Sequence, residues 1–157
     1  MNSPEPIVIT RGGLENVHVR ALLEEHLQSM ANLSPPESCH AMNTADLAQP
    51  DVTFWTAWVG NQVAGCGALK ALDARQGEIK SMRTASGFLR RGVAAEILQV
   101  ILDTARQRGY LQVSLETGSM EQFEPARRFY EEHGFTYCQP FADYFPDPHS
   151  VFMTRKL

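Results

Sequence analysis

Residues 89–95 read Leu-Arg-Arg-Gly-Val-Ala-Ala and stand directly before the clearest helical pattern in the chain. The apolar residues that follow recur at the spacing of one helix face, which is typical of an amphipathic helix: Val93, Ala94, Ile97, Leu98, Ile101, Leu102 and Ala105. Gly109 marks the expected end of this helix, and Arg106 and Arg108 lie in its last turn, where cations suit the helix dipole. Residues 78–111 are therefore predicted to form a strand, a tight turn and a helix.

The start of this helix suits an anion. The first turn of a helix has backbone N–H groups without partners and carries partial positive charge. Residues Gly92, Val93, Ala94 and Ala95 let an anion come close, and Arg90 and Arg91 add full charges. A pyrophosphate is the ligand that such a site would hold. Two arginines before a helix also occur on plain solvated surfaces, and the stretch is neither a P-loop nor a dinucleotide fingerprint.

Three segments that occur together and in order give the turn its context. They are Glu78-Ile-Lys-Ser-Met-Arg-Thr84, the Arg-Arg-Gly-Val-Ala turn, and Ala126-Arg-Arg-Phe-Tyr-Glu-Glu-His-Gly-Phe135. In this combination the chain resembles the GNAT superfamily of acetyl-CoA-dependent N-acetyltransferases. The resemblance covers residues 52–137 well, and both ends by general plan.

Two positions depart from the pattern of that superfamily. Its turn reads Gln/Arg-x-x-Gly-x-Gly/Ala, whereas Leu89 stands at the leading position here and Arg90 supplies a charge one place later. Phe123 stands where an Asn is often found three residues before the Ala of the later helix. The second departure removes one expected side-chain contact to the cofactor arm. It does not affect the backbone N–H groups at the helix start.

Composition indicates one globular domain spanning residues 1–157, with 43% hydrophobic and 20% charged residues. The net charge of −4 and the lack of a basic cluster argue against nucleic-acid binding. The N-terminus has neither a basic nor an apolar region of a signal peptide, and no apolar run approaches a membrane span. Cys39, Cys66 and Cys138 are widely spaced, which favours a reduced, cytoplasmic protein without a zinc site or a disulfide framework.

Hydrophobic alternation and turn residues place the remaining elements. Strands are expected at residues 6–10, 53–59, 62–72, 78–84, 111–117, 135–138 and 151–155, and further helices at 14–32 and 122–133. Gly60-Asn61 is a hairpin signal between two of the strands. With the resemblance, this pattern implies an α/β fold. Its central sheet would be mixed but mostly antiparallel, with six to seven strands, splayed between two central strands and covered by helices on both faces.

The segment from residue 32 to residue 43 contains Pro35-Pro36, which excludes helix and regular strand and predicts a loop. A short helical turn is expected from Thr44 to Ala48. The loop is either a plain connector or a wall of the acceptor site, because it carries the polar residues Glu37, Ser38 and His40. His18 and His26 lie on the helix before it, where an exposed or hydrogen-bonded histidine is more ordinary than a catalytic one.

The resemblance implies that pantetheine inserts between the two splayed strands. Backbone groups of Met82, Arg83 and Thr84 would then contact the cofactor, with an N–H near Met82 facing the thioester carbonyl. Glu78 is the first candidate for a general base, and a surface carboxylate at the strand end is the alternative. Glu116, at the equivalent end of the neighbouring strand, is the reserve.

Tyr130 is the candidate general acid for the departing thiolate, and a structural tyrosine is the alternative. The predicted function is acetyl transfer from acetyl-CoA to a primary amine, most simply that of a small molecule, with no metal. Net charge and the loop acids Glu37, Asp143 and Asp147 are the features that would draw a cationic acceptor. The alternatives are a non-catalytic acyl-CoA sensor and an enzyme acting on a protein or peptide amine. The sequence discloses neither the acceptor nor the oligomeric state, for which a homodimer stays open.

Overall fold

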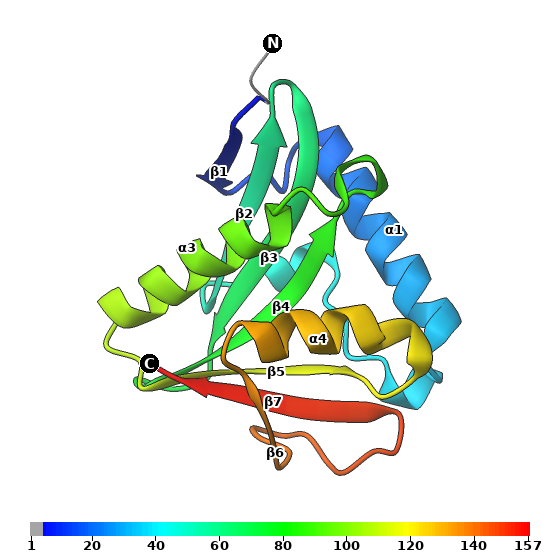
Figure 1. The fold of residues 1–157 in the computed structure, drawn as a ribbon, viewed down its shortest axis with the longest axis vertical. Coiled ribbons are helices and arrows are strands. Elements are labelled where there is room, and N and C mark those ends of the chain that lie inside the picture. Colours follow the sequence, from blue (N-terminus) through cyan, green and yellow to red (C-terminus); the bar gives the residue numbers. More distant parts are fainter. Residues whose placement is uncertain (1–4) are drawn as a thin grey trace.

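A computed structural model describes residues 5–157, so the first four residues of the N-terminal stretch discussed above lie outside the described part. The fold is built on one seven-stranded sheet with the order β1-β2-β3-β4-β5-β7-β6 (Figure 1). Its strands are β1 (Ile7–Arg11), β2 (Val52–Val59), β3 (Gln62–Ala71), β4 (Gln76–Thr84), β5 (Gln112–Gly118), β6 (Thr136–Cys138) and β7 (Ser150–Lys156). Only β4 and β5 pair in parallel among these strands, which confirms the predicted mixed, mostly antiparallel sheet.

Helices cover both faces of the sheet, as predicted (Figure 1). The apolar stripe of α3 (Val93–Gln107) packs in one core with Tyr130 of α4 (Glu124–Glu132). The helices α1 (Val17–Leu33) and α2 (Thr44–Leu47) pack in a second core on the other face, through Val19, Leu22, Leu23 and Leu47. Burial of an apolar face against the sheet is the main source of stability for each helix.

The feature that positions the site is the divergence of β4 from β5. The two strands pair only from Gln76 to Glu78 on β4, opposite Gln112 to Ser114 on β5, and have no pairing beyond that point. A bulge on β4 accompanies the divergence: Lys80 pairs with Ala68 and Arg83 with Cys66, so two residues face one, and Ser81 has a φ of 55°. The expected splay between two central strands is therefore present.

Local chemistry explains where elements differ from their predicted bounds. The first helix begins at Val17 rather than at Leu14, because the Asn16 side chain caps it by accepting from two backbone N–H groups. The loop after it includes one 3₁₀ turn, η1 (Pro36–Ser38), although the sequence predicted no helix there. Proline is tolerated in the first turn of a helix, so Pro36 does not prevent it. A further 3₁₀ turn, η3 (Glu121–Phe123), leads into α4.

Candidate active site

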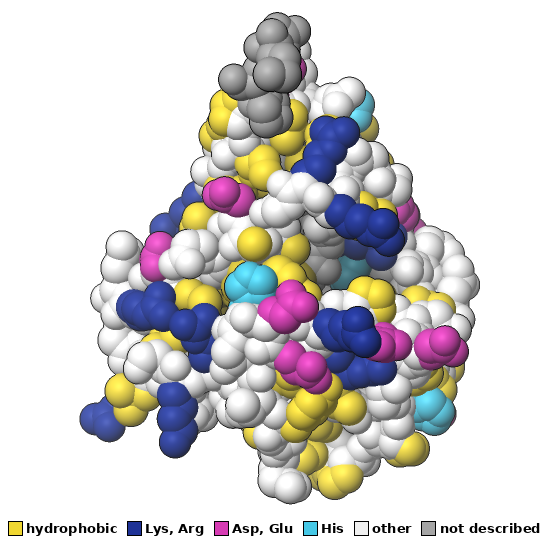
Figure 2. Space-filling view, viewed as in Figure 1, with side chains coloured by type: hydrophobic (Ala, Val, Ile, Leu, Met, Phe, Trp, Pro, Cys, Tyr) yellow, Lys and Arg dark blue, Asp and Glu magenta, His cyan; other side chains and the backbone are white. Residues whose placement is uncertain are grey.

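A cavity of about 720 Å³ occupies the gap between the diverging strands. Its lining comes from both faces of the sheet. On one face, the α3 side, the lining residues belong to the turn before α3, to α3 and to α4; on the other, the α1 side, they belong to α1 and to residues 38–41. Figure 2 shows the hollow on the surface, with Lys and Arg side chains on two sides of it. The cavity is therefore bordered by residues from both faces of the sheet.

The α3 side presents an open helix start. Gly92 occupies the N-cap in a left-handed conformation with φ of 83°, which favours glycine, and no side chain caps the helix. Backbone N–H groups of the first turn are thus free to bind an anion. Arg90 and Ala94 line the cavity, whereas Val93 is buried in the core. Arg91 lies over the Phe88 ring at 5.2 Å and lines a different hollow, so the two neighbouring arginines point to different places.

Met82, Arg83 and Thr84 of β4 all line the cavity, but the first two send their side chains to opposite faces. Met82 packs against the core that contains α3. Arg83 turns to the α1 side, where its Nη2 donates to Glu25 Oε1 at 2.8 Å. What the three residues share toward the gap is their backbone, since β5 does not pair with β4 beyond Glu78.

Glu78 is the last residue of β4 that pairs with β5, and it is buried, with 2% of its surface exposed. The alternative of a surface carboxylate at the strand end is therefore wrong. Its Oε2 accepts from the Tyr144 hydroxyl at 2.6 Å and from Lys80 Nζ at 3.4 Å. Glu78 Oε1 makes no hydrogen bond with a side chain in the described part of the chain. It is therefore left for another partner.

Lys80 and Tyr144 hold Glu78 in place. Lys80 Nζ also donates to the Tyr144 hydroxyl at 2.9 Å and to the backbone oxygen of His40 at 3.1 Å. Phe141 and Phe152 pack against the Tyr144 ring. Burial first, and then the charge of Glu78, raise the pKa of Tyr144 well above its ordinary value, so the phenol remains a hydrogen-bond donor.

Glu116, the reserve candidate for the base, binds a histidine. His40 Nδ1 lies 2.8 Å from Glu116 Oε1 and 2.9 Å from Oε2. A carboxylate only accepts hydrogen bonds, so Nδ1 is the donor, and in the neutral form of the ring Nε2 is an acceptor. His40 and Glu116 both line the α1 side of the gap, and residues 38–41 are thus a wall of the cavity rather than a plain connector.

Tyr130 approaches the same gap from α4. Its side chain lines the cavity, and its ring packs edge-on against Phe129 and Phe135. Burial raises the pKa of Tyr130 well above its ordinary value, which keeps the hydroxyl protonated. That hydroxyl forms no hydrogen bond with the described residues. Phe123, which replaces the family Asn, is buried with its ring directly over Gly118.

Comparison with known proteins decides the family. The sequence matches the model of the acetyltransferase (GNAT) family over residues 19–135. The chain belongs to the GNAT family. It is 60% identical over 139 residues to the uncharacterized N-acetyltransferase YsnE of Bacillus subtilis (strain 168), covering 88% of this chain and 92% of that protein. It is 51% identical over 139 residues to the uncharacterized N-acetyltransferase YedL of Escherichia coli (strain K12), covering 88% and 87%.

The fold agrees with this assignment. The PaiA N-acetyltransferase of Thermoplasma acidophilum, solved in complex with coenzyme A, superposes with a TM-score of 0.75 at 16% identity, covering 97% of this chain and 99% of that one. This likeness shows the expected fold, and the family model and the two N-acetyltransferase relatives show that the chain is an acyltransferase, so the predicted resemblance is confirmed.

The side chains of this GNAT enzyme also correct one expectation. None of the loop acids expected to draw a cationic acceptor, Glu37, Asp143 and Asp147, lines the cavity. Asp147 instead accepts from the Ser38 hydroxyl at 2.5 Å and from the backbone N–H of His149 at 2.8 Å. It ties residues 38–41 to the loop between β6 and β7, which is a structural task.

Sequence reasoning missed the partners that complete the site. Lys80 and Tyr144 were not singled out, and His40 was noted only as a polar loop residue. His40 could have been found from its place in a polar loop. Tyr144 could not, because it lies in a loop of mixed polar and aromatic residues that shows no sequence pattern.

Within residues 5–157 no group of three or more His, Cys, Asp and Glu side chains is arranged to hold a metal ion. No helix in that range is long and apolar enough to cross a membrane.

Proposed function

We propose that this GNAT enzyme transfers the acetyl group of acetyl-CoA to the primary amine of a small molecule. The observation that carries the proposal is the cavity through the split sheet, with an uncapped helix start on one side and the buried Glu78 on the other. The free N–H groups and Arg90 suit a pyrophosphate, and no atom lies within 4 Å of where a Gly92 side chain would start. The coenzyme A complex of the structurally similar PaiA supports this ligand.

The fixed wall on the α1 side favours a small acceptor over a protein or peptide. Residues 38–41 are fastened to the β6–β7 loop by the Ser38–Asp147 hydrogen bond and to β4 by Lys80. A peptide substrate would need a groove that runs along this face, whereas a cavity of about 720 Å³ walled by these residues is of the size that holds small ligands.

The residues at the gap divide the reaction among them. Acetyl-CoA supplies an activated thioester, whose C–S bond breaks as the amine forms the new C–N bond. Glu78 takes the proton of the attacking amine on Oε1, while Tyr144 and Lys80 hold Oε2. The backbone N–H near Met82 donates to the carbonyl oxygen as negative charge develops there. Tyr130 gives its hydroxyl proton to the leaving thiolate.

The His40–Glu116 pair offers a second candidate for the base. Glu116 fixes the ring through Nδ1, so that Nε2 is the atom able to accept a proton, as in other carboxylate-supported histidine bases. In that case Glu78 would position Lys80 and Tyr144 instead. Both carboxylates lie near the point at which β4 and β5 separate, so substitution of each one separately tells the two schemes apart.

A screen for thiol release tests the proposal. The protein is incubated with acetyl-CoA and, in separate pools, amino acids, polyamines, aminoglycosides and peptides, and free thiol is measured over time. We expect release that depends on one small-molecule pool and that falls in the Glu78→Gln variant. Tight binding of acetyl-CoA with no amine-dependent release in any pool would contradict enzymatic transfer to these amines, and release with peptides alone would contradict a small-molecule acceptor.

A further inference from the structure

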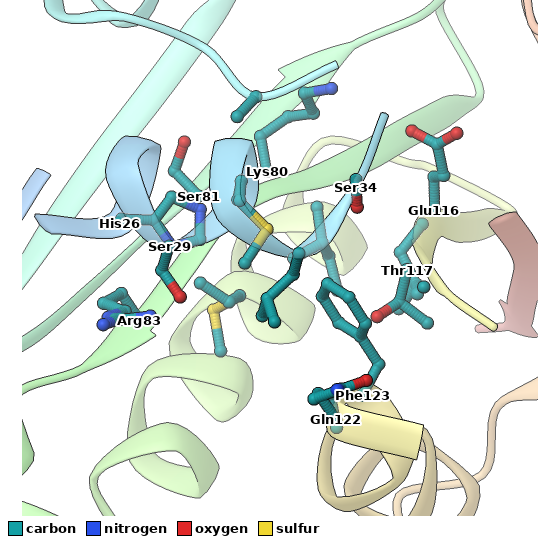
Figure 3. Close-up of a pocket in the computed structure, with 18 of the residues that line it drawn as sticks. His26, Ser29, Ser34, Lys80, Ser81, Arg83, Glu116, Thr117, Gln122 and Phe123 are labelled. Atoms are coloured by element: carbon teal, nitrogen blue, oxygen red, sulfur yellow. The ribbon is translucent and has the colours of Figure 1, made fainter. Parts of the chain in front are cut away.

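Three polar side-chain atoms near the cavity are buried and have no hydrogen-bond partner among the described residues. They are His26 Nδ1, Ser81 Oγ and Arg83 Nε, and all three residues line the cavity. Figure 3 shows them together on one side of the cavity, with Glu116 on the opposite side. Burying a polar atom without a partner costs stability, so such atoms are nearly always paired in native proteins. Three such atoms in the lining of one cavity indicate that a bound ligand or water supplies their hydrogen-bond partners.

The chemistry of the three residues fits an oxyanion. Nε and Nη2 of Arg83 lie on one edge of the guanidinium, which is the edge that binds a carboxylate through two hydrogen bonds. Nη2 donates to Glu25, whose side chain is half-exposed, and Nε is unused. The Ser81 hydroxyl offers a second donor. Burial, and then the charge of Arg83, lower the pKa of His26 to about 4, so the ring stays neutral and compatible with the arginine.

The other charges on the α1 side argue in the same direction. Three acidic residues line the cavity, and each is already paired: Glu25 with Arg83, Glu78 with Lys80 and Glu116 with His40. Glu25 and Glu78 thus already face a full positive charge, and Glu116 is the one acid of the described lining that lacks a cationic partner when His40 is neutral, so the lining offers few sites for a second ammonium group. Such a lining suits an acceptor with one amine and a compensating negative charge, not a polyamine.

We propose that His26, Ser81 and Arg83 form a subsite for a carboxylate on the acceptor, so that the acceptor is an amino acid or a similar zwitterion. The inference rests on the proposed acetyl transfer. Ser81 and Arg83 flank Met82, whose backbone N–H is assigned to the thioester carbonyl, and Glu78 lies three residues before Ser81 on the same strand. A carboxylate held there leaves the amine of the same molecule close to the base and to the thioester.

Matched pairs of acceptors test this subsite. Each L-amino acid is compared with its carboxamide, and each ω-amino acid of two to six carbons with the alkylamine of the same length. An amino-acid amide is the weaker base and offers more free amine at a given pH, so a preference for the acid reports recognition of the carboxylate. We expect kcat/KM of the wild type to be roughly tenfold or more higher for the acid in the preferred pair, the value of a hydrogen bond to a charged group.

Three variants assign that preference to the subsite. Arg83→Gln should lower kcat/KM for the acid roughly tenfold more than for its amide. Ser81→Ala should do so to a smaller degree. Glu25→Gln removes the ion pair but leaves the guanidinium, so the preference for the acid should persist; loss of the preference in Glu25→Gln as in Arg83→Gln would show a merely structural role. Arg106→Gln, on the exposed face of α3, is the matched control.

The outcomes separate this inference from the function on which it rests. Acetylation of amines with no preference for the acid, or an equal preference in wild type and in folded Ser81→Ala and Arg83→Gln, overturns the subsite and leaves acetyl transfer standing. The three atoms would then be completed by ordered water. Failure to acetylate any member of this panel also overturns the subsite. Acetyl transfer itself falls only if the polyamine and aminoglycoside pools of the screen give no thiol release either, with acetyl-CoA bound.

Discussion

The α3 side and the α1 side of the cavity differ in what they offer a ligand. The α3 side offers mainly backbone: the uncapped N–H groups after Gly92, with Arg90 beside them. The α1 side offers side chains that come from four separate segments, joined as Glu78–Tyr144 and His40–Glu116. A backbone cradle can bind a group that every relative of a fold uses, whereas a lining of side chains can change with the acceptor.

The largest loss of activity is expected for Tyr130, which lines the cavity on the α3 side and is the proposed general acid. Tyr130→Phe removes one oxygen, so packing and acetyl-CoA affinity should hold, while kcat should fall by roughly 10²–10⁴-fold, the usual contribution of a general acid. Calorimetry and steady-state rates on the same folded variant measure the two quantities. Tyr137→Phe, at an exposed tyrosine on β6, is the control. A parallel loss of affinity and rate would make Tyr130 a packing residue.

A loss of roughly 10²-fold in kcat/KM is expected for Glu78→Gln on the α1 side. The amide keeps the shape but cannot take the proton. The loss should shrink as pH rises toward the pKa of the amine, because more amine is then already deprotonated. Glu116→Gln should lose less at every pH. If instead Glu116→Gln and His40→Gln carry the pH-dependent loss and Glu78→Gln does not, the base is His40.

The α1 side also contains a buried histidine whose protonation opposes folding. His26 has a pKa of about 4 in the folded protein against 6.5 as the ordinary value, so the unfolded chain binds more protons between these pH values. Stability from this group is full above pH 6.5 and is lost as pH falls toward 4, by up to about 3 kcal/mol. Urea unfolding of wild type and His26→Gln at pH 7 and 4.5 measures it. An equal drop in both proteins would contradict this origin.

The smallest effect is expected on acetyl-CoA affinity, and it distinguishes the roles of Arg90 and Arg91 on the α3 side. Arg90→Glu should weaken acetyl-CoA binding about tenfold, because this side chain lines the cavity, where an anion would lie. Arg91→Glu should change affinity by about twofold or less, since its guanidinium lies over Phe88 and outside the cavity. Calorimetric titration of each folded variant gives the two affinities. Similar losses in both would restore the prediction that the arginines act as a pair.

The two sides also differ in how far the sequence predicts them. The helix start, Gly92 and the stripe of α3 are contiguous, so local rules of spacing and capping apply to them directly. The split of β4 from β5 followed from the family resemblance, and the three-residue pairing bears it out. Glu78 was predicted as a candidate because it lies on that strand, but its burial was not.

The α1 side could not be predicted in the same way. His40 and Glu116 are 76 residues apart, and Glu78 and Tyr144 are 66 apart, and no single-sequence pattern encodes such pairs. The side chains of Arg83 and Met82 point to opposite faces of the sheet. The bulge at Ser81 decides which face each one reaches, and so which ligand it could contact. A bulge changes the face to which later residues point, and alternation alone does not reveal it.

A crystal structure of the protein with acetyl-CoA tests most directly the claim that the gap joins two sides with different tasks. We predict that the pyrophosphate lies at the N–H groups of the first turn of α3, beside Arg90. The acetyl group should lie between β4 and β5, with its carbonyl oxygen at the Met82 N–H and one face of its carbonyl carbon open toward Glu78. A pyrophosphate bound elsewhere, or an acetyl group that stays on the α3 side without reaching the gap, would contradict the claim.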